Sequence, residues 1–237
     1  MGNPTRLLLH GAGGRMGQAL LRLCSERDDC RVVAAVSASQ PSQRVIDGVP
    51  HFSATELGGA PDFDVAIDFS LPPGFDAILA ACLARDAGLV SGTTGLSGAQ
   101  HAALQDAGAR IGVLWSANFS LGVALLEELV ERAAGTLHGW DCDIVEMHHT
   151  RKLDAPSGTA LALGAAAEKA GAQPRYASLR AGDIVGEHLV QFTTAGERIE
   201  LVHRAGSRDI FARGALHAAL ALAGREAGVY RLRDMLA

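Results

Sequence analysis

Short apolar runs alternate with helical patterns along the first half of the chain. These runs are continuous rather than alternating, as expected for strands that are covered on both faces of a sheet. Strands that alternate with helices predict a parallel sheet with right-handed crossovers. We expect strands at residues 6–10, 31–36, 64–69, 89–91 and 111–115, and helices at 16–24, 77–85 and 99–107.

The pattern changes after Asn118. An amphipathic helix at 121–134 is followed by an alternating strand at 141–148 and a helix of small residues at 157–170. Two further strands, at 184–193 and 198–204, flank Gly196 and predict a hairpin, which belongs to an antiparallel or mixed sheet. A last helix is expected at 210–225. The pattern thus predicts an α/β chain of two domains, a βαβ half and an α+β half.

Composition and charge narrow the class of protein. The 237 residues include 28 Gly and carry 21 basic against 26 acidic side chains, a net charge of −5, which disfavours nucleic acid as a partner. The four cysteines form no C-x-x-C and no metal-type spacing, which is typical of reduced, buried thiols in a cytosolic protein. No apolar stretch approaches 18 residues and the start lacks a signal-peptide pattern. We expect a soluble, cytoplasmic protein with no membrane partner.

A glycine-rich loop lies between the first strand and the first helix. Gly11, Gly14 and Gly17 fit G-x-x-G-x-x-G, whereas Met16 breaks the stricter G-x-G-x-x-G. Residues without Cβ permit such a turn, and a phosphate then lies on the N–H groups and positive end of the helix. The loop predicts a dinucleotide site; the alternative is an ordinary strand–helix turn.

Two further segments bear on the cofactor. The acid that usually follows the second strand and binds the ribose of NAD is absent, and Ser37 stands there. NADP is therefore permitted but not specified. The Gly92-Thr-Thr-Gly95 segment ends a parallel strand, where its Thr hydroxyls and Gly N–H groups would meet the nicotinamide; the alternative is a plain turn with capping Thr.

The segment from Glu146 to Thr159 (EMHHTRKLDAPSGT) concentrates titratable side chains. Pro156 suits the first position of a helix, so we expect the N–H groups of Ser157, Gly158 and Thr159 to point outward unpaired and to bind a carboxylate or phosphate. Lys152 stands in a chain that otherwise uses Arg almost throughout, and an ammonium, unlike a guanidinium, can give up a proton.

Other readings of the histidines remain open. His148 and His149 would face opposite ways in a continuing strand and serve one site only if the strand ends there. The alternatives are a solvated basic loop, or a metal held by His148, His149 and Asp154, although that spacing matches no known ligand set. We interpret the isolated histidines as structural, and the Glu187-His188 and His203-Arg204 pairs as the solvated face of the hairpin. The isolated ones are His10, His51, His101, His138 and His217.

Several motifs occur in an order that resembles the 4-hydroxy-tetrahydrodipicolinate reductase (dihydrodipicolinate reductase) family. They are GAGGRMG at 11–17, GTTG at 92–95, SANFSLGV at 116–123, EMHHTRKLDAPSGTA at 146–160, SLRAGDIVGEHLVQF at 178–192 and SRDIFARGA at 207–215. The resemblance implies NAD(P)H-dependent reduction in diaminopimelate and lysine biosynthesis, and homotetramers whose substrate-domain sheets associate. It also implies a Rossmann-like nucleotide domain at 1–118 and 208–237, completed by the last helix, and a substrate-binding and oligomerisation domain at 119–207 with a mixed open sheet.

The resemblance also assigns roles by position. His148 matches the proton donor or acceptor of the family and Lys152 its second catalytic residue, with no metal. Substrate contacts are His149, Lys152, Ser157, Gly158 and Thr159, and the substrate is a small dicarboxylate. Contacts to NADH or NADPH are Gly11, Ala12, Gly13, Gly14, Arg15, Met16, Gly92, Thr93, Thr94, Ser116, Ala117, Asn118 and Phe119. Two departures are Ser37 in place of the acid and a short stretch between Ser37 and Asp62. The alternatives are another two-domain nicotinamide oxidoreductase acting on a small carboxylic acid, or a dinucleotide-sensing protein without chemistry.

Overall fold

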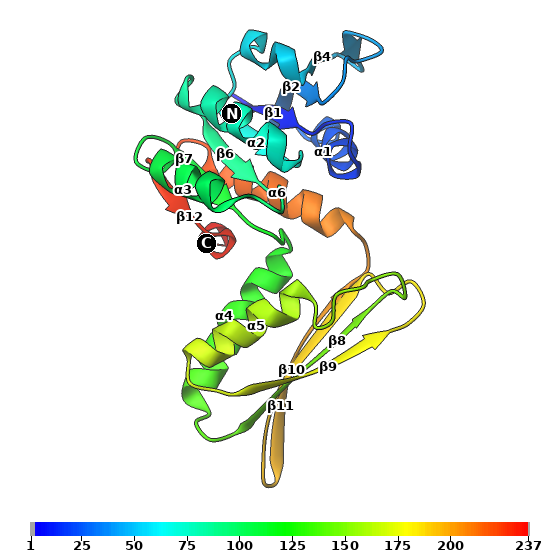
Figure 1. Cartoon of the computed structure of the whole chain (residues 1–237), viewed down its shortest axis with the longest axis vertical. Coiled ribbons are helices and arrows are strands. Elements are labelled where there is room, and N and C mark those ends of the chain that lie inside the picture. Colours follow the sequence, from blue (N-terminus) through cyan, green and yellow to red (C-terminus); the bar gives the residue numbers. More distant parts are fainter. Residues whose placement is uncertain (1–2, 237) are drawn as a thin grey trace. The chain divides into compact units, whose positions relative to one another are not determined.

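The computed structural model describes residues 3–236 and divides into two compact units (Figure 1). The first unit comprises Met1–Phe119 and Phe211–Ala237, and the second comprises Ser120–Ile210. The boundaries expected from the sequence, after residue 118 and before residue 208, lie close to these. No helix among the described residues is long and apolar enough to cross a membrane.

The first unit is built on an eight-stranded sheet in the order β12-β7-β6-β5-β1-β2-β4-β3. Neighbouring strands are parallel except for β3 and β4 at one edge, which confirms the predicted parallel sheet. From β1 the chain adds β2, β4 and β3 on one side and then β5, β6, β7 and β12 on the other. The direction of strand addition therefore reverses between β1 and β5, and ligands bind at such a point in parallel sheets. The strands are β1 (Thr5–His10), β2 (Cys30–Ser37), β3 (Val45–Ile46), β4 (Val49–Ser53), β5 (Val65–Asp68), β6 (Gly88–Ser91), β7 (Gly112–Trp115) and β12 (Gly228–Tyr230).

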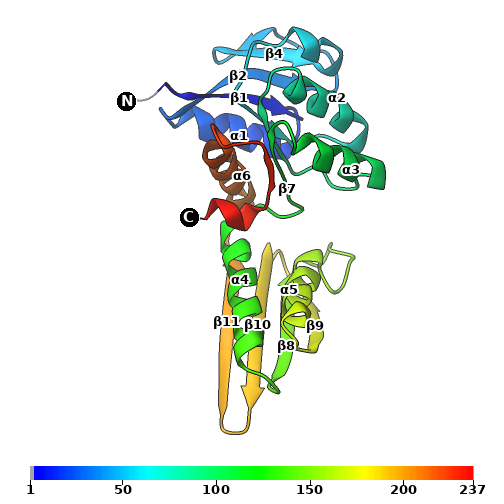
Figure 2. The same cartoon turned by 90° about the vertical axis from the view of Figure 1, so that its left-hand side faces the viewer.

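Helices cover both faces of this sheet (Figure 2). On one face α2 (Pro72–Leu83) and α3 (Gly98–Ala107) enclose a core that includes Leu8, Phe75 and Leu104. On the other face lie α1 (Arg15–Ser25) and α6 (Asp209–Leu222), and Gly88 and Gly112 of the sheet contact Leu222 of α6. The burial of both faces explains why the strands are continuous apolar runs.

The sequence did not predict several elements of the first unit. Between β2 and β5 it gave no assignment, and the structure forms β3, β4 and the 3-10 helix η1 (Ala54–Gly59) there. The short strand β12 and the 3-10 helix η2 (Leu232–Met235) were also missed. Helix α2 begins at Pro72 rather than residue 77, because its two prolines occupy the first helical positions, where no N–H is needed.

The second unit is a four-stranded sheet in the order β11-β10-β8-β9 with two helices on one face (Figure 2). The predicted hairpin is present, and with β8 parallel to β9 and antiparallel to β10 the sheet is mixed, as predicted. Strand β9 was not predicted. The elements are α4 (Leu121–Thr136), β8 (Asp141–His148), α5 (Gly158–Lys169), β9 (Pro174–Arg180), β10 (Gly186–Thr194) and β11 (Glu197–Ala205).

Small residues let α5 lie close to the sheet. A Cβ at Gly164 would stand 1.8 Å from the hydroxyl oxygen of Tyr176 on β9, so only glycine permits this approach. Leu163 of α5 packs with Leu126 and Val130 of α4 on Ile144 and the other inward strand residues. The helices therefore bury one face of the sheet, and both begin at the end where β8 terminates.

Candidate active site

The glycine-rich loop lies at the carboxyl end of β1, at the point where the strand order reverses. The N–H groups of Gly11 and Ala12 both donate to the carbonyl of Val36 at 2.9 Å, which fixes the start of the loop. Gly11 has φ +83°, and a Cβ there would lie 2.4 Å from the carbonyl oxygen of Phe69, so the position requires glycine. Gly13 and Gly14 are exposed.

The start of α1 is suited to an anion. Gly14 caps the helix without a side-chain hydrogen bond, and the first turn carries no acid. The first N–H groups of the helix and its positive end are therefore open to a phosphate. The residues present thus fit a dinucleotide phosphate.

Beside the loop, a buried carboxylate ties three strand ends together. Asp68 accepts hydrogen bonds from the hydroxyls of Ser91 and Thr93, both at 2.8 Å, and its other oxygen lies 2.8 Å from His10 Nδ1. Burial raises the pKa of Asp68, but these partners outweigh it and hold that pKa below its ordinary value. His10 is thus structural, as expected from the sequence.

This network changes the picture of the Gly92–Gly95 segment. Thr93 is buried and its hydroxyl is engaged by Asp68, so that hydroxyl faces inward rather than toward a ligand. Thr94 is exposed. Trp115 donates to the Thr93 carbonyl at 2.8 Å, which further fixes the segment. Only Thr94 offers a free side chain of the predicted pair.

The Ser116–Phe119 segment forms a tight turn at the end of the first unit. The Ser116 hydroxyl donates to the Asn118 carbonyl at 2.6 Å, and the Asn118 N–H donates back to that hydroxyl at 3.2 Å. Phe119 is buried edge-to-face on Phe69, with ring centroids 5.5 Å apart. Phe119 is therefore part of the packing under the loops, while Ala117 is exposed.

In the second unit, His148 ends β8 and is held by a buried carboxylate. Its Nδ1 lies 2.5 Å from Glu146 Oε2, and its Nε2 lies against Gly186. Glu146 is itself clamped by both terminal nitrogens of Arg180, at 2.7 and 2.9 Å. Burial raises the pKa of Glu146, but hydrogen bonds from Arg180, Ser178 and His148 outweigh it and lower the pKa to about 2. Glu146 is thus a fixed negative charge behind the imidazole.

Lys152 lies in the loop between β8 and α5. Its Nζ contacts the carboxylate of Asp154 at 2.8 Å, and the Lys152 side chain is 23% exposed. The ammonium and the Gly158 N–H lower the pKa of Asp154. Asp154 therefore joins the lysine to the beginning of α5.

The predicted start of the following helix is wrong in one respect. Helix α5 begins at Gly158 with Ser157 as its N-cap, whose hydroxyl accepts from the Ala160 N–H. The Ser157 N–H is not unpaired, because it donates to Glu146 Oε1 at 3.2 Å. The Gly158 N–H lies near Asp154 and contributes to the lowered pKa of that carboxyl. Both carboxylates lie there because β8 and its loop run past the helix start.

His188 was also misplaced by the sequence, which put it on a solvated face. It is 4% exposed, lies under α5, and its Nε2 is 3.2 Å from the Ser157 hydroxyl. Its ring contacts that of His148 at 5.3 Å between centroids. Burial, with the neighbouring His148 and His203, lowers the pKa of His188 to about 4, so this ring is neutral near pH 7. His203 occupies the matching place on β11, with Nε2 3.2 Å from the hydroxyl of Ser120, the N-cap of α4.

His149 points away from this cluster but stays at the same end of the unit. Its Nε2 lies 3.3 Å from Arg208, and burial and nearby cations, Arg151 first among them, lower its pKa. The alternative of a metal held by His148, His149 and Asp154 finds no support, since within residues 3–236 no group of three or more His, Cys, Asp or Glu side chains is placed to hold one. The four cysteines are free and buried, as predicted.

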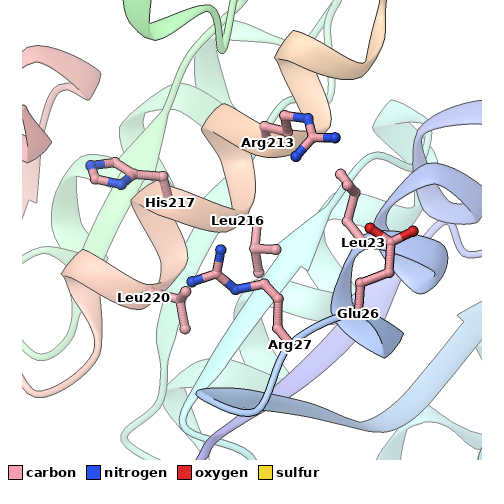
Figure 3. Close-up of a pocket in the computed structure, with 7 residues that line it drawn as sticks. All are labelled: Leu23, Glu26, Arg27, Arg213, Leu216, His217 and Leu220. Carbon is pink, nitrogen blue, oxygen red and sulfur yellow. The ribbon is translucent and has the colours of Figure 1, made fainter.

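A pocket of about 430 Å³ lies elsewhere in the first unit, between α1 and α6 (Figure 3). Leu23, Leu216 and Leu220 line it together with Glu26, Arg27, Arg213 and His217. The α1 residues come from the end of that helix opposite the glycine-rich loop, and no predicted site residue lines the pocket. Its lining brings residues of α6 and of the end of α1 together within the first unit, and the resemblance implied that the last helix packs on the nucleotide domain.

A parallel sheet with a glycine-rich loop at its reversal point, joined to a mixed-sheet unit with a polar cluster at one end, defines a two-unit dinucleotide-binding oxidoreductase. Family models agree with both units: "Dihydrodipicolinate reductase, N-terminus" matches residues 5–119 and "Dihydrodipicolinate reductase, C-terminus" matches residues 122–236. The chain belongs to the dihydrodipicolinate reductase family.

Individual relatives support this membership. Proteins named 4-hydroxy-tetrahydrodipicolinate reductase from Stenotrophomonas maltophilia (strain R551-3) and Xanthomonas euvesicatoria pv. vesicatoria (strain 85-10) are 70% and 69% identical, over 98% and 99% of this chain and 98% of each relative. The one from Xylella fastidiosa (strain 9a5c) is 63% identical over 98% of both chains. The reductase activity in these names is an oxidoreduction, consistent with the fold.

Solved structures match the fold. A dipicolinate-bound dihydrodipicolinate reductase from Paenisporosarcina sp. TG-14 superposes with a TM-score of 0.83 at 21% identity, covering 98% of this chain and all of that one. A diaminopimelate (DAP) dehydrogenase from C. glutamicum, in complex with DAP, gives a TM-score of 0.65 at 13% identity, covering 98% and 94%. The architecture is thus shared with other oxidoreductases.

Sequence reasoning missed three residues that organise the second-unit cluster. Glu146 and Arg180 were read only as parts of longer motifs, and His188 was assigned to solvent. One signal was available: Glu146 alternates with His148 on β8 and so shares its face. No signal pointed to Arg180, because its strand was not predicted.

Proposed function

We propose that the chain catalyses the reduction of 4-hydroxy-tetrahydrodipicolinate to tetrahydrodipicolinate with loss of water. In the overall balance, the substrate, one NADH or NADPH and one proton give the product, the oxidised cofactor and water. The observation that carries the proposal is the family match, which spans both units of the chain at up to 70% identity to proteins of that name.

The second unit is the proposed substrate site. The substrate is a cyclic imine with two carboxylates, and we assign Lys152, His149, Ser157, Gly158 and Thr159 to hold it. A carboxylate that reaches the start of α5 replaces Asp154 at the Lys152 ammonium, and so exchanges one carboxylate for another. This exchange keeps the local charge balanced, which favours an anionic substrate.

Proton transfer is the chemistry left to the side chains. Loss of the ring hydroxyl together with a proton from the neighbouring ring carbon gives water and a carbon–carbon double bond conjugated with the imine. When bound, the reduced nicotinamide would supply a hydride to the carbon that carried the hydroxyl. The enamine that results requires a proton on carbon, and we assign its delivery to Lys152 or His148. His148 is held at Nδ1 by Glu146, which leaves Nε2 as the atom for exchange. A positioned acid of this kind contributes about 10²–10⁴-fold to the rate.

The first unit is the proposed cofactor site. We assign the pyrophosphate to the 11–16 loop, and the nicotinamide half to Gly92, Thr94 and the 116–119 turn. Thr93 would support this segment through the hydrogen bond from its hydroxyl to Asp68. Ser37 lies beside this loop, since a Cβ at Gly13 would stand 3.3 Å from its hydroxyl. Because no carboxylate stands at Ser37 to repel a 2′-phosphate, we propose that both NADH and NADPH serve as reductants.

Steady-state kinetics test this function. Wild-type protein with freshly made 4-hydroxy-tetrahydrodipicolinate should oxidise NADH, NADPH or both, and Lys152→Ala and His148→Ala should lower kcat by about 10²–10⁴-fold. Matched controls are Lys169→Ala and His138→Ala: Lys169 is exposed and pairs with Glu131, and His138 is exposed. Absence of turnover in the folded wild-type protein, or kcat values for both site variants equal to those of the controls, would refute the assignment.

We further propose that the chain forms homotetramers through the open face of the second-unit sheet. No helix of that unit covers this face, and a row of Ala177, Val145, Leu189 and Val202 runs across its four strands in register. Val202 is 41% exposed and Leu179 in the next row 52%. Polar pairs such as Arg175–Asp143 and Arg204–Glu187 flank the row, as at the rim of a protein interface.

A further inference from the structure

Arg180 is the last residue of β9 and lies next to His148, the last residue of β8, in the register of the sheet. Its guanidinium has five N–H groups, and five hydrogen bonds use them. Two go to the two oxygens of Glu146 and one to the carbonyl of Leu179. The other two reach the carbonyls of Lys152, at 3.2 Å, and Asp154, at 2.5 Å.

Through Glu146 this guanidinium acts on the imidazole. The bidentate pair holds the carboxylate with Oε2 facing His148 Nδ1, and the Glu146 side chain is only 1% exposed. A carboxylate accepts hydrogen bonds and does not donate them, so Nδ1 carries the proton and Nε2 is presented for exchange. The other titratable groups near this ring are His188 on β10, at 5.3 Å between centroids, and His149 next to it in the chain.

Through the two carbonyls the same guanidinium acts on the lysine. The backbone of the loop is otherwise held by the bond from the Lys152 N–H to the His149 carbonyl and the bond from the Thr150 N–H to the Gly182 carbonyl. Neither of these bonds fixes the loop beyond residue 152. The bonds from Arg180 to the Lys152 and Asp154 carbonyls do, and Asp154 in turn holds the Lys152 ammonium.

We propose that Arg180 is a positioning residue of the reductase reaction, which sets the imidazole of His148 and the ammonium of Lys152 in one geometry through the Glu146 carboxylate and the two loop carbonyls. Lysine cannot replace it, because an ammonium has three donors and lacks the planar fork. The kinetic part of this inference rests on the proposed function.

The test compares Arg180→Lys with a control of the same chemistry. Arg6→Lys changes another guanidinium that bonds a carboxylate through two nitrogens, Asp64, outside both proposed sites. We expect Arg180→Lys to lower kcat by about 100-fold, the loss typical of a misplacement near 1 Å, with the KM for reduced cofactor unchanged. Arg6→Lys should keep the wild-type kcat. Equal kcat for Arg180→Lys and wild type would overturn the proposal.

A second variant, Glu146→Gln, separates positioning from a purely structural role. Delivery of a proton requires the protonated imidazole, and the amide removes the negative charge that stabilises this form beside Nδ1, so the alkaline limb of the kcat pH profile should move to lower pH. A variant whose kcat is lower at every pH, with the limbs of the profile at the wild-type pH values, would contradict the proposal. This variant also serves if Arg180→Lys does not fold.

Dipicolinate binding gives a readout that does not need turnover. Calorimetric titration of wild type, Arg180→Lys and Arg6→Lys with dipicolinate should show at least about ten-fold weaker binding for Arg180→Lys only. Equal affinities would overturn the positioning role. If wild type binds dipicolinate and Arg180→Lys does not, but wild type turns over no substrate, the proposed function fails while the positioning of this site stands.

Discussion

Gly17, near the start of α1, leaves no room for a side chain beside the phosphate loop. A Cβ on Gly17 would lie 2.4 Å from Ala12 Cα and 2.5 Å from the Gly11 carbonyl oxygen. Both contacts are with backbone, so no side-chain rotation relieves them. Ordinary contacts of a Cβ begin near 3.4 Å, so Gly17→Ala requires the loop and the helix to separate by about 1 Å.

That separation acts on bonds that fix the loop. The N–H groups of Gly11 and Ala12 bond the Val36 carbonyl at 2.9 Å, and the Gln18 side chain donates to the Ala12 carbonyl at 2.8 Å. Overpacking of this kind costs about 1–3 kcal/mol in the free energy of unfolding. The same displacement moves the N–H groups at the start of α1, so affinity for NADH or NADPH should fall at least about ten-fold.

Two measurements check this prediction: urea unfolding, and fluorescence titration with each reduced cofactor. Gly98→Ala is the matched control, because Gly98 is the first residue of α3 and a Cβ there meets nothing within 4 Å. The control should keep cofactor affinity and gain up to about 1 kcal/mol from helix propensity. If Gly17→Ala has the same free energy of unfolding and the same cofactor affinity as wild type, the close approach of α1 to its loop does not shape the cofactor site.

Two further outcomes follow from the second unit. Since the pKa of Glu146 is about 2 in the folded chain and ordinarily 4.5, stability should fall as the pH drops from about 4.5 to 2, by of the order of 3 kcal/mol from this group. Urea unfolding at fixed protein concentration should therefore give a shallower fall for Glu146→Gln; parallel curves would contradict the ion pair. Leu189→Asp on the open sheet face should dissociate the homotetramer in light scattering, whereas Val45→Asp, 56% exposed on β3 of the first unit, should not. A Leu189→Asp protein that remains tetrameric would exclude this face as the interface.

Local pattern accounts for much of what the sequence predicted. The parallel sheet follows from continuous apolar strands alternating with helices, and the hairpin at Gly196 follows from two strands around a turn. The glycine-rich loop could be identified because other backbone atoms lie too close to Gly11 and Gly17 for any residue with a Cβ. The family could be identified from the order of its motifs, because each motif is a short run of consecutive residues that is visible without the tertiary structure.

Elements with weak local signals were missed. Strand β9 is largely exposed and partly polar (PRYASLR), so its pairing with β8 comes from the sheet and not from its own pattern. The short strands β3, β4 and β12 lie in or beside loops and depend on their neighbours. Tertiary context decides such segments because a strand cannot satisfy its own hydrogen bonds.

The sequence by itself determined the two-unit α/β plan, the phosphate loop and the segment that holds His148 and Lys152. Only the tertiary structure decided how those side chains are held. Arg180 is 34 residues from Glu146, and His188 is 31 residues from Ser157, so no local period relates them. It also decided that the Ser157 N–H is already bonded and that the Thr93 hydroxyl faces inward. Buried polar groups must find partners wherever the fold brings them, and that requirement acts through space rather than along the chain.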